Sequence, residues 1–274
     1  MKAVLGIDVG GSTTKIVGFD ENGKLIAPMF VRGSDQITSI YGAFGKFTAE
    51  NGLGLSDVRG IKVTGVGASF LERGIYSLKC DKVSEFESIG RGGLYLSGLD
   101  RALITSMGTG SACVYADSNG TIEYLGGTGI GGGTLMGLSK VMLGMDNVKH
   151  IYELASEGDL SRVDLKIKHI TKKGDFSAME PELTVANFGK LSDIAEKSDV
   201  ALGILNMVFE AVGTTAKFAA RTKNVRDIVL IGNLTDIPQA RTLFEGIGRM
   251  LDVNFIIPEH SQFGTVIGAA LSDK

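Results

Sequence analysis

One unit of supersecondary structure occurs twice in this sequence, and that repeat limits the possible folds more than any other feature. In each copy an apolar strand leads into a glycine turn, a second strand follows, and a further turn leads to a third strand. The first copy covers residues 3–31 and the second covers residues 102–125. A duplicated unit of this kind predicts an α/β protein with two similar domains and a cleft between them.

The rest of the chain shows the apolar spacing of helices and short strands. Helices are predicted at residues 37–51, 138–144, 147–156, 199–222, 239–251 and 264–271. Short apolar runs predict strands at residues 60–65, 226–231 and 253–257. The charged residues 159–182 predict a short helix mixed with a loop.

Glycine is the unusual component of the composition. It supplies 39 of the 274 residues, roughly twice the average usage, whereas proline supplies only four. The hydrophobic share of 43% and the charged share of 22% are those of a globular protein, so collagen-like and disordered chains are excluded. The excess glycine therefore belongs to folded structure, and we expect it where backbone approaches another group closely.

Charge and cysteine usage exclude several classes of protein. The net charge of −3 and the pI of about 5.7 provide no basic field for nucleic acid. No run of about 18 apolar residues predicts a membrane span, and the apolar start of the chain ends at Asp8, too early for a signal peptide. Cys80 and Cys113 lie far apart and the three histidines do not cluster, so no disulfide framework or zinc site is expected. These observations favour a cytoplasmic protein.

The glycine turn of the first copy combines backbone donors, a cation and an acid. Glycine allows a turn to approach phosphate oxygens with its N–H groups, and the neighbouring hydroxyls and lysine add further donors. Asp8, at the end of the strand, could hold Mg²⁺ directly or through water. The alternative is a tight hairpin with an exposed acid, and the spacing of a P-loop is absent. The candidate residues are Asp8, Gly10, Gly11, Ser12, Thr13 and Lys15.

Two further glycine segments are candidates for phosphate binding. The turn of the second copy, with Gly108 and Gly110, is equivalent to the first turn. Residues 126–134 hold six glycines in nine positions directly ahead of a helical run. Unpaired N–H groups and the positive end of the helix dipole predict an anion site there, whereas a flexible linker is the alternative. The phosphate candidates of this loop are Gly129, Gly131, Gly132, Gly133 and Thr134.

Two other segments carry weaker signals. The apolar strand at residues 228–231 opens into Gly232 and Asn233, which could form a floor for a nucleobase or ribose, or could simply end the strand. Glu85 and Glu87 flank Phe86, and a carboxylate beside a phosphate cleft could accept the proton of an attacking hydroxyl. Solvated surface carboxylates are the usual alternative for such a pair.

Together these segments resemble the type II (eukaryotic-like) pantothenate kinases of the actin-like, sugar-kinase and acetate-kinase ATPase superfamily. The resemblance covers most of the chain. Its most specific parts are the glycine loop, the GD and VDL residues between 158 and 165, and the ANFG segment at 186–189. The other matching segments are GIDVGGSTTK at 6–15, EFE at 85–87, MGTGSA at 107–112, IVLIGNL at 228–234 and FGTVIGAAL at 263–271.

The resemblance implies a fold, a reaction and an assembly. It implies two duplicated ribonuclease-H-like domains, residues 1–82 and residues 83–274, with ATP and Mg²⁺ in the cleft between them. The terminal helix, residues 261–274, would pack back on the first domain, and the second domain would carry the elements of a homodimer. The reaction would be transfer of the γ-phosphoryl group to the terminal hydroxyl of pantothenate, the first step of coenzyme A biosynthesis.

The resemblance also implies roles for individual residues. Glu85 matches the catalytic base, Asp8 the acid near the metal, and Lys15 the lysine that faces the phosphates. Thr109 falls where the family has a small hydroxyl residue against the substrate. The glycines of the two turns and of the loop at 129–134 would hold phosphates, and Gly232 and Asn233 would lie by the adenosine.

One departure from the family concerns the acceptor. Tyr124 stands where the family normally has an arginine that contacts pantothenate, and residues 102–139 contain no lysine or arginine. Tyrosine does not replace the charge-assisted contact of a guanidinium at equal strength. Either a cation from elsewhere substitutes, with Arg91 and Arg101 nearest in sequence, or the acceptor is a related small molecule.

Two other functions compete with the kinase. One is an ATPase activator of the acyl-CoA dehydratase or reductase type, which shares the opening motif but holds an iron–sulfur cluster through cysteines. Cys80 and Cys113 are a poor ligand set for such a cluster. The other is a nucleotide sensor that binds ATP without phosphorylating an acceptor.

Overall fold

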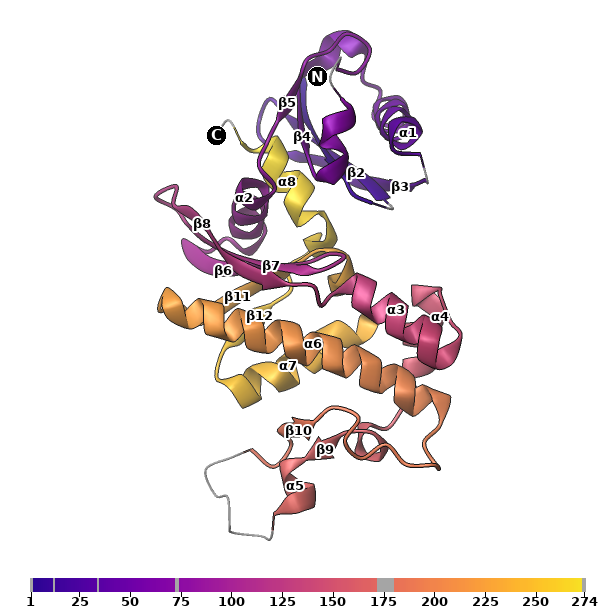
Figure 1. The fold of residues 1–274 in the computed structure, drawn as a ribbon. Coiled ribbons are helices and arrows are strands. Elements are labelled where there is room, and N and C mark those ends of the chain that lie inside the picture. The colour runs from indigo at the N-terminus through magenta and orange to yellow at the C-terminus, as the bar shows by residue number, and fades with distance from the viewer. Residues whose placement is uncertain (1, 12, 34, 72–73, 172–179, 273–274) are drawn as a thin grey trace.

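The computed structural model describes residues 2–11, 13–33, 35–71, 74–171 and 180–272, so the candidate Ser12 lies outside the described residues. The chain forms two lobes, each built on a five-stranded mixed sheet (Figure 1). The strand order is β3-β2-β1-β4-β5 in the first sheet and β8-β7-β6-β11-β12 in the second. Because the two orders correspond strand for strand, the duplication expected from the sequence is confirmed.

Both sheets place a hairpin beside a parallel strand from further along the chain. In the first sheet β1 pairs antiparallel with β2 and parallel with β4, and in the second β6 pairs antiparallel with β7 and parallel with β11. The strands of the first sheet are β1 Ala3–Val9, β2 Thr13–Asp20, β3 Leu25–Arg32, β4 Val58–Thr64 and β5 Cys80–Lys82. Those of the second are β6 Arg101–Met107, β7 Ser111–Asp117, β8 Ile122–Thr128, β11 Asp227–Ile231 and β12 Asn254–Ile256.

Amphipathic helices cover the outer faces of the two sheets. In the first lobe α1, Gln36–Glu50, packs Phe44 and Phe47 on the buried strands and begins at Asp35, whose carboxylate accepts from Thr38 N at 2.6 Å. In the second lobe the main helices are α3 Gly132–Leu143, α4 Val148–Ala155, α6 Lys197–Thr222 and α7 Pro238–Leu251. Short 3₁₀ helices connect these elements: Leu55–Asp57, Val66–Phe70, Leu160–Arg162, Asn233–Asp236 and Ser261–Phe263.

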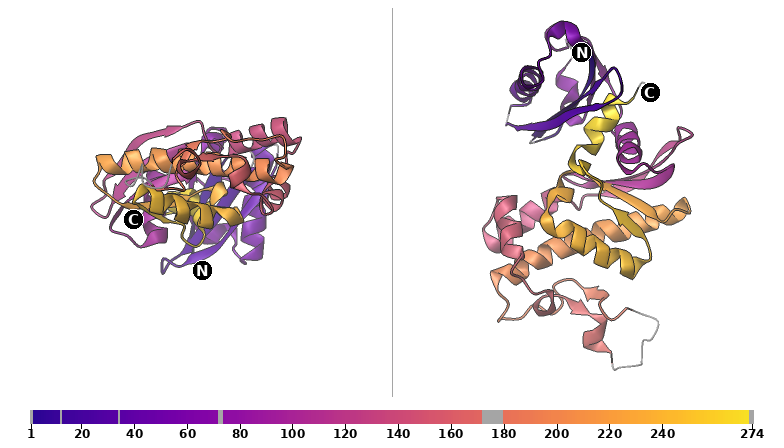
Figure 2. Two further views of the ribbon diagram at one scale, coloured as in Figure 1. Left: turned by 90° about the horizontal axis from the view of Figure 1, so that it is seen from below. Right: turned by 180° about the vertical axis from the view of Figure 1, so that it is seen from behind.

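Two glycine-rich helices lie between the sheets and join the lobes (Figures 1 and 2). α2, Glu85–Ser97, contacts the second sheet, and α8, Gly264–Ala270, contacts β1, β2 and β4 of the first. A Cβ added to Gly92 would overlap the carbonyl oxygen of Gly264, and one added to Gly268 would overlap that of Ser88. The sequence predicted α8 but not α2, because three glycines within α2 weaken its helical signal.

α6 is the long helix of the second lobe, and it matches the helix predicted at residues 199–222. By length and composition alone this described helix could cross a membrane, although no such span was expected from the sequence. However, 61% of its most apolar 18-residue window is buried inside the fold. Its buried Leu205, Phe209 and Val212 belong to the core that also contains Leu103 and Leu230 of the sheet. The apolar character of α6 is therefore that of a core helix.

A small polar extension projects from the second lobe at the end opposite the first lobe (Figure 1). It contains the antiparallel pair β9 Leu165–Lys166 and β10 Thr184–Ala186, and the short helix α5 Ile167–Ile170. The sequence predicted the short helix but not the strand pair, which is too short to show alternation.

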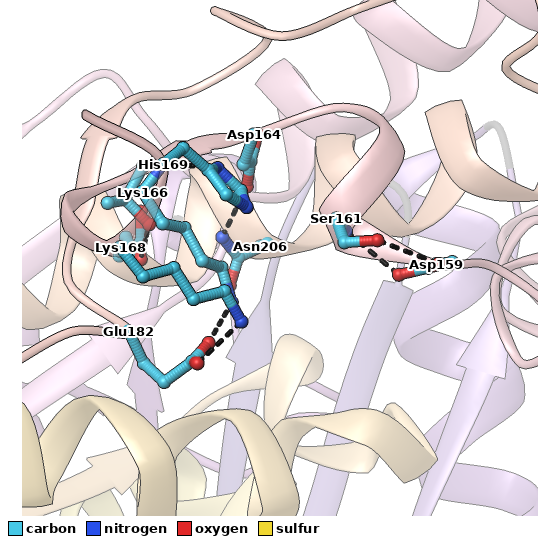
Figure 3. Close-up of polar contacts among 10 residues, drawn as sticks. Asp159, Ser161, Asp164, Lys166, Lys168, His169, Glu182 and Asn206 are labelled. Atoms are coloured by element: carbon cyan, nitrogen blue, oxygen red, sulfur yellow. Dashed lines mark hydrogen bonds and ion pairs between the residues drawn. The ribbon is translucent and has the colours of Figure 1, made fainter. Parts of the chain in front are cut away.

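Polar contacts hold this extension together and fix it to α6 (Figure 3). The carboxylate of the buried Asp164 accepts from Asn206 Nδ2 and Phe188 N, each at 2.9 Å. Glu182 accepts from the ammonium groups of both Lys166 and Lys168, and these bonds lower the pKa of Glu182 to about 2.

Candidate active site

A cavity of about 640 Å³ lies between the lobes and has walls from both. The first lobe contributes the ends of β2 and β3, and the second lobe contributes the β6–β7 turn, the start of α3 and the segment after β11. Among the predicted site residues, those that line it are Thr13, Lys15, Gly108, Thr109, Gly132, Gly133 and Asn233. The structure therefore brings together residues from both copies of the repeated unit.

Asp8 and Lys15 face each other across the first hairpin, in register between β1 and β2. Lys15 is only 8% exposed, and its Nζ donates to Gln262 O at 2.5 Å, which ties the first sheet to the segment before α8. Burial raises the pKa of Asp8, and the charge of Lys15 opposes that shift. Burial lowers the pKa of Lys15, against the charges of Asp8 and Asp236. The site thus contains a desolvated pair of opposite charges, each shifted toward its neutral form by burial.

The surroundings of Asp8 suit a magnesium ion held jointly with phosphate. Thr64 is the partner of Asp8 on β4, and its buried Oγ1 has no hydrogen-bond partner among the residues that the structure describes. Gly65, at a φ of 85°, leaves room for the carboxylate, since a Cβ there would lie 2.5 Å from Asp8 Oδ1. The described residues contain no cluster of three or more metal-binding side chains. Mg²⁺ is usually bound by one or two carboxylates together with phosphate and water, so Asp8 fits this ion.

The glycine loop packs directly on the β6–β7 turn. Gly132 N donates to Gly108 O and Gly133 N donates to Thr109 O, each at 2.8 Å. A Cβ on Gly131 would lie 2.7 Å from Gly110 O. α3 starts at Gly132, six residues before the predicted helix at 138, because tertiary packing offsets the low helix propensity of glycine. The prediction that the N–H groups of this loop are unpaired is therefore wrong for Gly132 and Gly133.

The side chain of Thr134 forms two hydrogen bonds within the same loop. Its Oγ1 donates to Gly129 O at 3.0 Å and accepts from Gly131 N at 3.3 Å. In the described part of the chain, the N–H groups of Gly108, Thr109 and Gly110 have no hydrogen-bond partner. The turn therefore offers three unpaired backbone donors, and the loop packs against the turn through Gly132 and Gly133.

The first turn and the end of β11 are also formed by backbone contacts. Gly10 N donates to Thr13 O at 3.0 Å and closes the first hairpin, while no described residue beyond its chain neighbours lies within 4 Å of a Cβ built on Gly11. Gly232 adopts a φ of 99°, and a Cβ there would lie 2.6 Å from Met107 O. This contact leads the chain into Asn233, which lines the cavity.

Two predicted residues, Glu85 and Tyr124, are not among the residues that line this cavity. Glu85 is the first residue of α2, and partial burial together with the negative charge of Asp8 raises its pKa. Tyr124 on β8 stacks on Phe86, with ring centroids 4.0 Å apart and ring planes at 16°. The stack brings Tyr124 against Phe86 in the first turn of α2.

Arg32, Phe30 and Asp236 also line the cavity, and sequence reasoning did not select them. Arg32 is the last residue of β3 and is the register partner of Thr13. The predicted hairpin contains a signal for Arg32. Because the third strand runs back along the second, its last residue lies level with the first glycine turn.

The duplicated sheets and the cavity between them define the class of this protein: it has the two-lobed actin-like ATPase fold. A similar solved structure is the activator of the 2-hydroxyisocaproyl-CoA dehydratase from Clostridium difficile with bound ADPNP, with a TM-score of 0.69, 18% identity and coverage of 98% of this chain and 93% of that one. A ROK family glucokinase from Streptomyces griseus in complex with glucose and AMPPNP has a TM-score of 0.62 at 14% identity and covers 98% of both chains. At these identities the likeness concerns the fold alone.

The chain belongs to the Fumble family, whose model matches residues 101–243. A type II pantothenate kinase from Bacillus cereus (strain AH820) is 31% identical over 242 residues, covering 85% of this chain and 83% of the relative. A type II pantothenate kinase from Staphylococcus saprophyticus is 27% identical over 284 residues, covering 97% and 98%. The resemblance to this family expected from the sequence is confirmed.

Proposed function

We propose that this protein is an ATP-dependent kinase that phosphorylates the terminal hydroxyl of pantothenate, the first step of coenzyme A biosynthesis. The observation that carries the proposal is the similarity to type II pantothenate kinases over 85% of the chain. The cavity between the lobes supports it, because both hairpin turns reach that cavity.

In this proposal the hairpin turns hold the phosphates of ATP. Phosphoryl transfer requires in-line positioning and neutralisation of charge more than covalent chemistry by the protein. Lys15 and the free N–H groups of residues 108–110 would contact phosphate oxygens, and Asp8 would hold Mg²⁺. When bound, that ion neutralises phosphate charge. The loop at 129–134 would keep the second turn rigid, and Gly232 and Asn233 would lie by the adenosine.

The acceptor would bind near the first turn of α2. Glu85 would accept the proton of the attacking hydroxyl, and its raised pKa suits a group that must take up a proton. Thr109 and Tyr124 would contact the acceptor from the second lobe. Tyr124 is stacked on Phe86 and provides no charge for the carboxylate of pantothenate. A related hydroxyl compound is therefore the alternative acceptor.

The proposal extends to the organisation of the molecule. We place the domain boundary between residues 82 and 83, because β5 ends at Lys82 and α2 begins at Glu85. The terminal helix would then belong to the first domain through its contacts with β1 and β4. A cytoplasmic homodimer is proposed from the family resemblance.

The ATPase activator is the less favoured alternative. Cys113 is 1% exposed within β7, where its Sγ lies 3.7 Å from Thr105 Oγ1. Burial raises the pKa of the Cys113 thiol, which disfavours the thiolate that ligates iron. The residues of this chain therefore do not fit the bridging cluster of such activators.

A coupled assay of ADP release with a panel of acceptors tests the proposal. The panel contains pantothenate, pantetheine and glucose, each with Mg²⁺ and ATP. We expect turnover with pantothenate well above that with no acceptor. Turnover with pantetheine alone would show that the protein is a kinase with a substrate other than pantothenate. ATP binding without turnover on any acceptor would favour the nucleotide sensor.

A further inference from the structure

The two cations that line the cavity differ in how far nearby protein groups balance their charge. Lys15 and Arg32 are the cations among the lining residues that the structure describes, and Asp146 and Asp236 are the acids. The ammonium of Lys15 interacts with the charges of Asp8 and Asp236 and donates to Gln262 O. Much of its charge is therefore already balanced within the protein. A bound polyphosphate would require a further cation.

Arg32 has the properties of that cation. Its side chain is exposed at the end of β3 and lines the cavity, level with Thr13 on β2. In the described ranges no carboxylate lies within ion-pair distance of its guanidinium. The contact that orients it is the ring of Phe30, whose centroid lies 5.6 Å from Cζ. A cation–π contact holds a guanidinium in place without cancelling its charge.

We propose that Arg32 binds the polyphosphate of the nucleotide and is the contact of β3 with that ligand. This inference rests on the proposed use of ATP. A planar guanidinium donates paired hydrogen bonds to phosphate oxygens, and it stays charged at any pH of interest. Arg32 lines the same cavity as Lys15 and Asn233, whereas Glu85 and Tyr124 do not. Its position thus favours the nucleotide over the acceptor.

Titration calorimetry with Mg²⁺ and either ATP or adenosine tests this role without requiring turnover. For Arg32→Gln we expect ATP affinity to fall about 10- to 100-fold, the usual range for a charge-assisted bond, with adenosine affinity unchanged. Arg32→Lys should give an intermediate loss, because it keeps the charge but loses the paired geometry. Arg59→Gln is the matched control, since Arg59 pairs with Glu21 at the opposite end of the same sheet.

Three results would overturn the proposal. Unchanged ATP affinity in Arg32→Gln would show that Arg32 does not contact the polyphosphate. Equal losses of affinity for ATP and for adenosine would show that Arg32 maintains the structure of the cavity and does not contact the polyphosphate. A raised KM for the acceptor with unchanged ATP affinity would assign the guanidinium to the acceptor. Failure of the kinase assay alone would leave these binding results intact, so the two proposals are tested separately.

Discussion

In the second lobe, the glycines of the site bring two backbone segments into contact. Gly131 lies against Gly110, and Gly132 and Gly133 donate to the carbonyl groups of the β6–β7 turn. Any side chain at Gly131 would collide with the turn. Because the carbonyl groups of Gly108 and Thr109 are hydrogen-bonded to the loop, the turn that lines the cavity is held in one conformation. Preorganised donors of this kind stabilise charge without reorganisation during the reaction.

The proposed base is tested by Glu85→Gln. Glutamine retains the shape of the side chain but cannot accept the proton, so we expect turnover to fall about 10²- to 10⁴-fold with ATP affinity within about twofold of the wild type. Steady-state kinetics and calorimetry measure the two quantities. Glu87→Gln is the control two residues away, since Glu87 pairs with Arg91 at 2.9 Å. Unchanged turnover in Glu85→Gln would exclude Glu85 as the base.

The sequence indicated the residues whose chemistry lies in a local motif. Asp8 and Lys15 stand on either side of a glycine turn, and the structure places them face to face in register. Arg32 belongs to no motif, because its position depends on the pairing of β3 with β2. The pairing of Gly132 N and Gly133 N was also missed, since their acceptors lie 24 residues earlier, at Gly108 and Thr109.

At the scale of elements, the crossing of α2 and α8 determines how the lobes are joined. Gly92 lies against the backbone of Gly264 and Gly268 lies against that of Ser88, and neither position has room for a Cβ. Glycine lowers the stability of each isolated helix, and the packing of the pair offsets that cost. Local patterns could not reveal α2 for this reason.

Gly268→Ala is expected to destabilise the protein by about 1–3 kcal/mol or more, because the added methyl group meets the backbone of Ser88 and Gly92. Urea unfolding measures the change. Gly42→Ala on α1 is the matched control, since no described atom outside its own helix turn lies within 4 Å of its Cβ position, and it should stabilise by about 0.5–1 kcal/mol. Equal stability of the two variants would argue against close packing at the crossing.

The polar extension should make the stability of the protein depend on pH. The pKa of Glu182 is about 2, below its ordinary value of 4.5, because Lys166 and Lys168 hydrogen-bond to its carboxylate. A lowered pKa in the folded state contributes stability that is present above pH 4.5 and is lost as the pH falls toward 2. Since the Glu182 side chain is 55% exposed, the contribution is less than about 1 kcal/mol.

Glu182→Gln should therefore lower stability at pH 7 and lose its effect progressively below pH 4.5. Urea unfolding of both proteins across that range measures the difference, which added salt should reduce. The neighbouring variant Glu180→Gln is the control. A constant difference between Glu182→Gln and wild type at every pH would show that the effect does not come from the carboxylate charge.

At the scale of the molecule, the site exists only where the two lobes meet. The repeated unit predicted two similar lobes, and the sheets have the same strand order. The repeat does not determine how the lobes face each other. That arrangement depends on the α2–α8 crossing and on the bond from Lys15 to Gln262 O, both between segments far apart in sequence. The sequence therefore predicted the turns and a cleft between the lobes, but it did not determine which residues of the two lobes line that cleft.

A ligand bound in this cavity should slow amide hydrogen exchange in both lobes. Ligand at about 100 times its Kd adds about 2.7 kcal/mol to the stability of the state that binds it. We expect Mg²⁺ and ATP to slow amide hydrogen exchange in peptides from β3 and from the β6–β7 turn, because both line the cavity. Peptides from residues 160–170 are the internal control, since they lie at the far end of the second lobe (Figure 1). Protection of the β6–β7 turn without β3 would mean that the nucleotide binds to the second lobe alone, which would also contradict the role of Arg32.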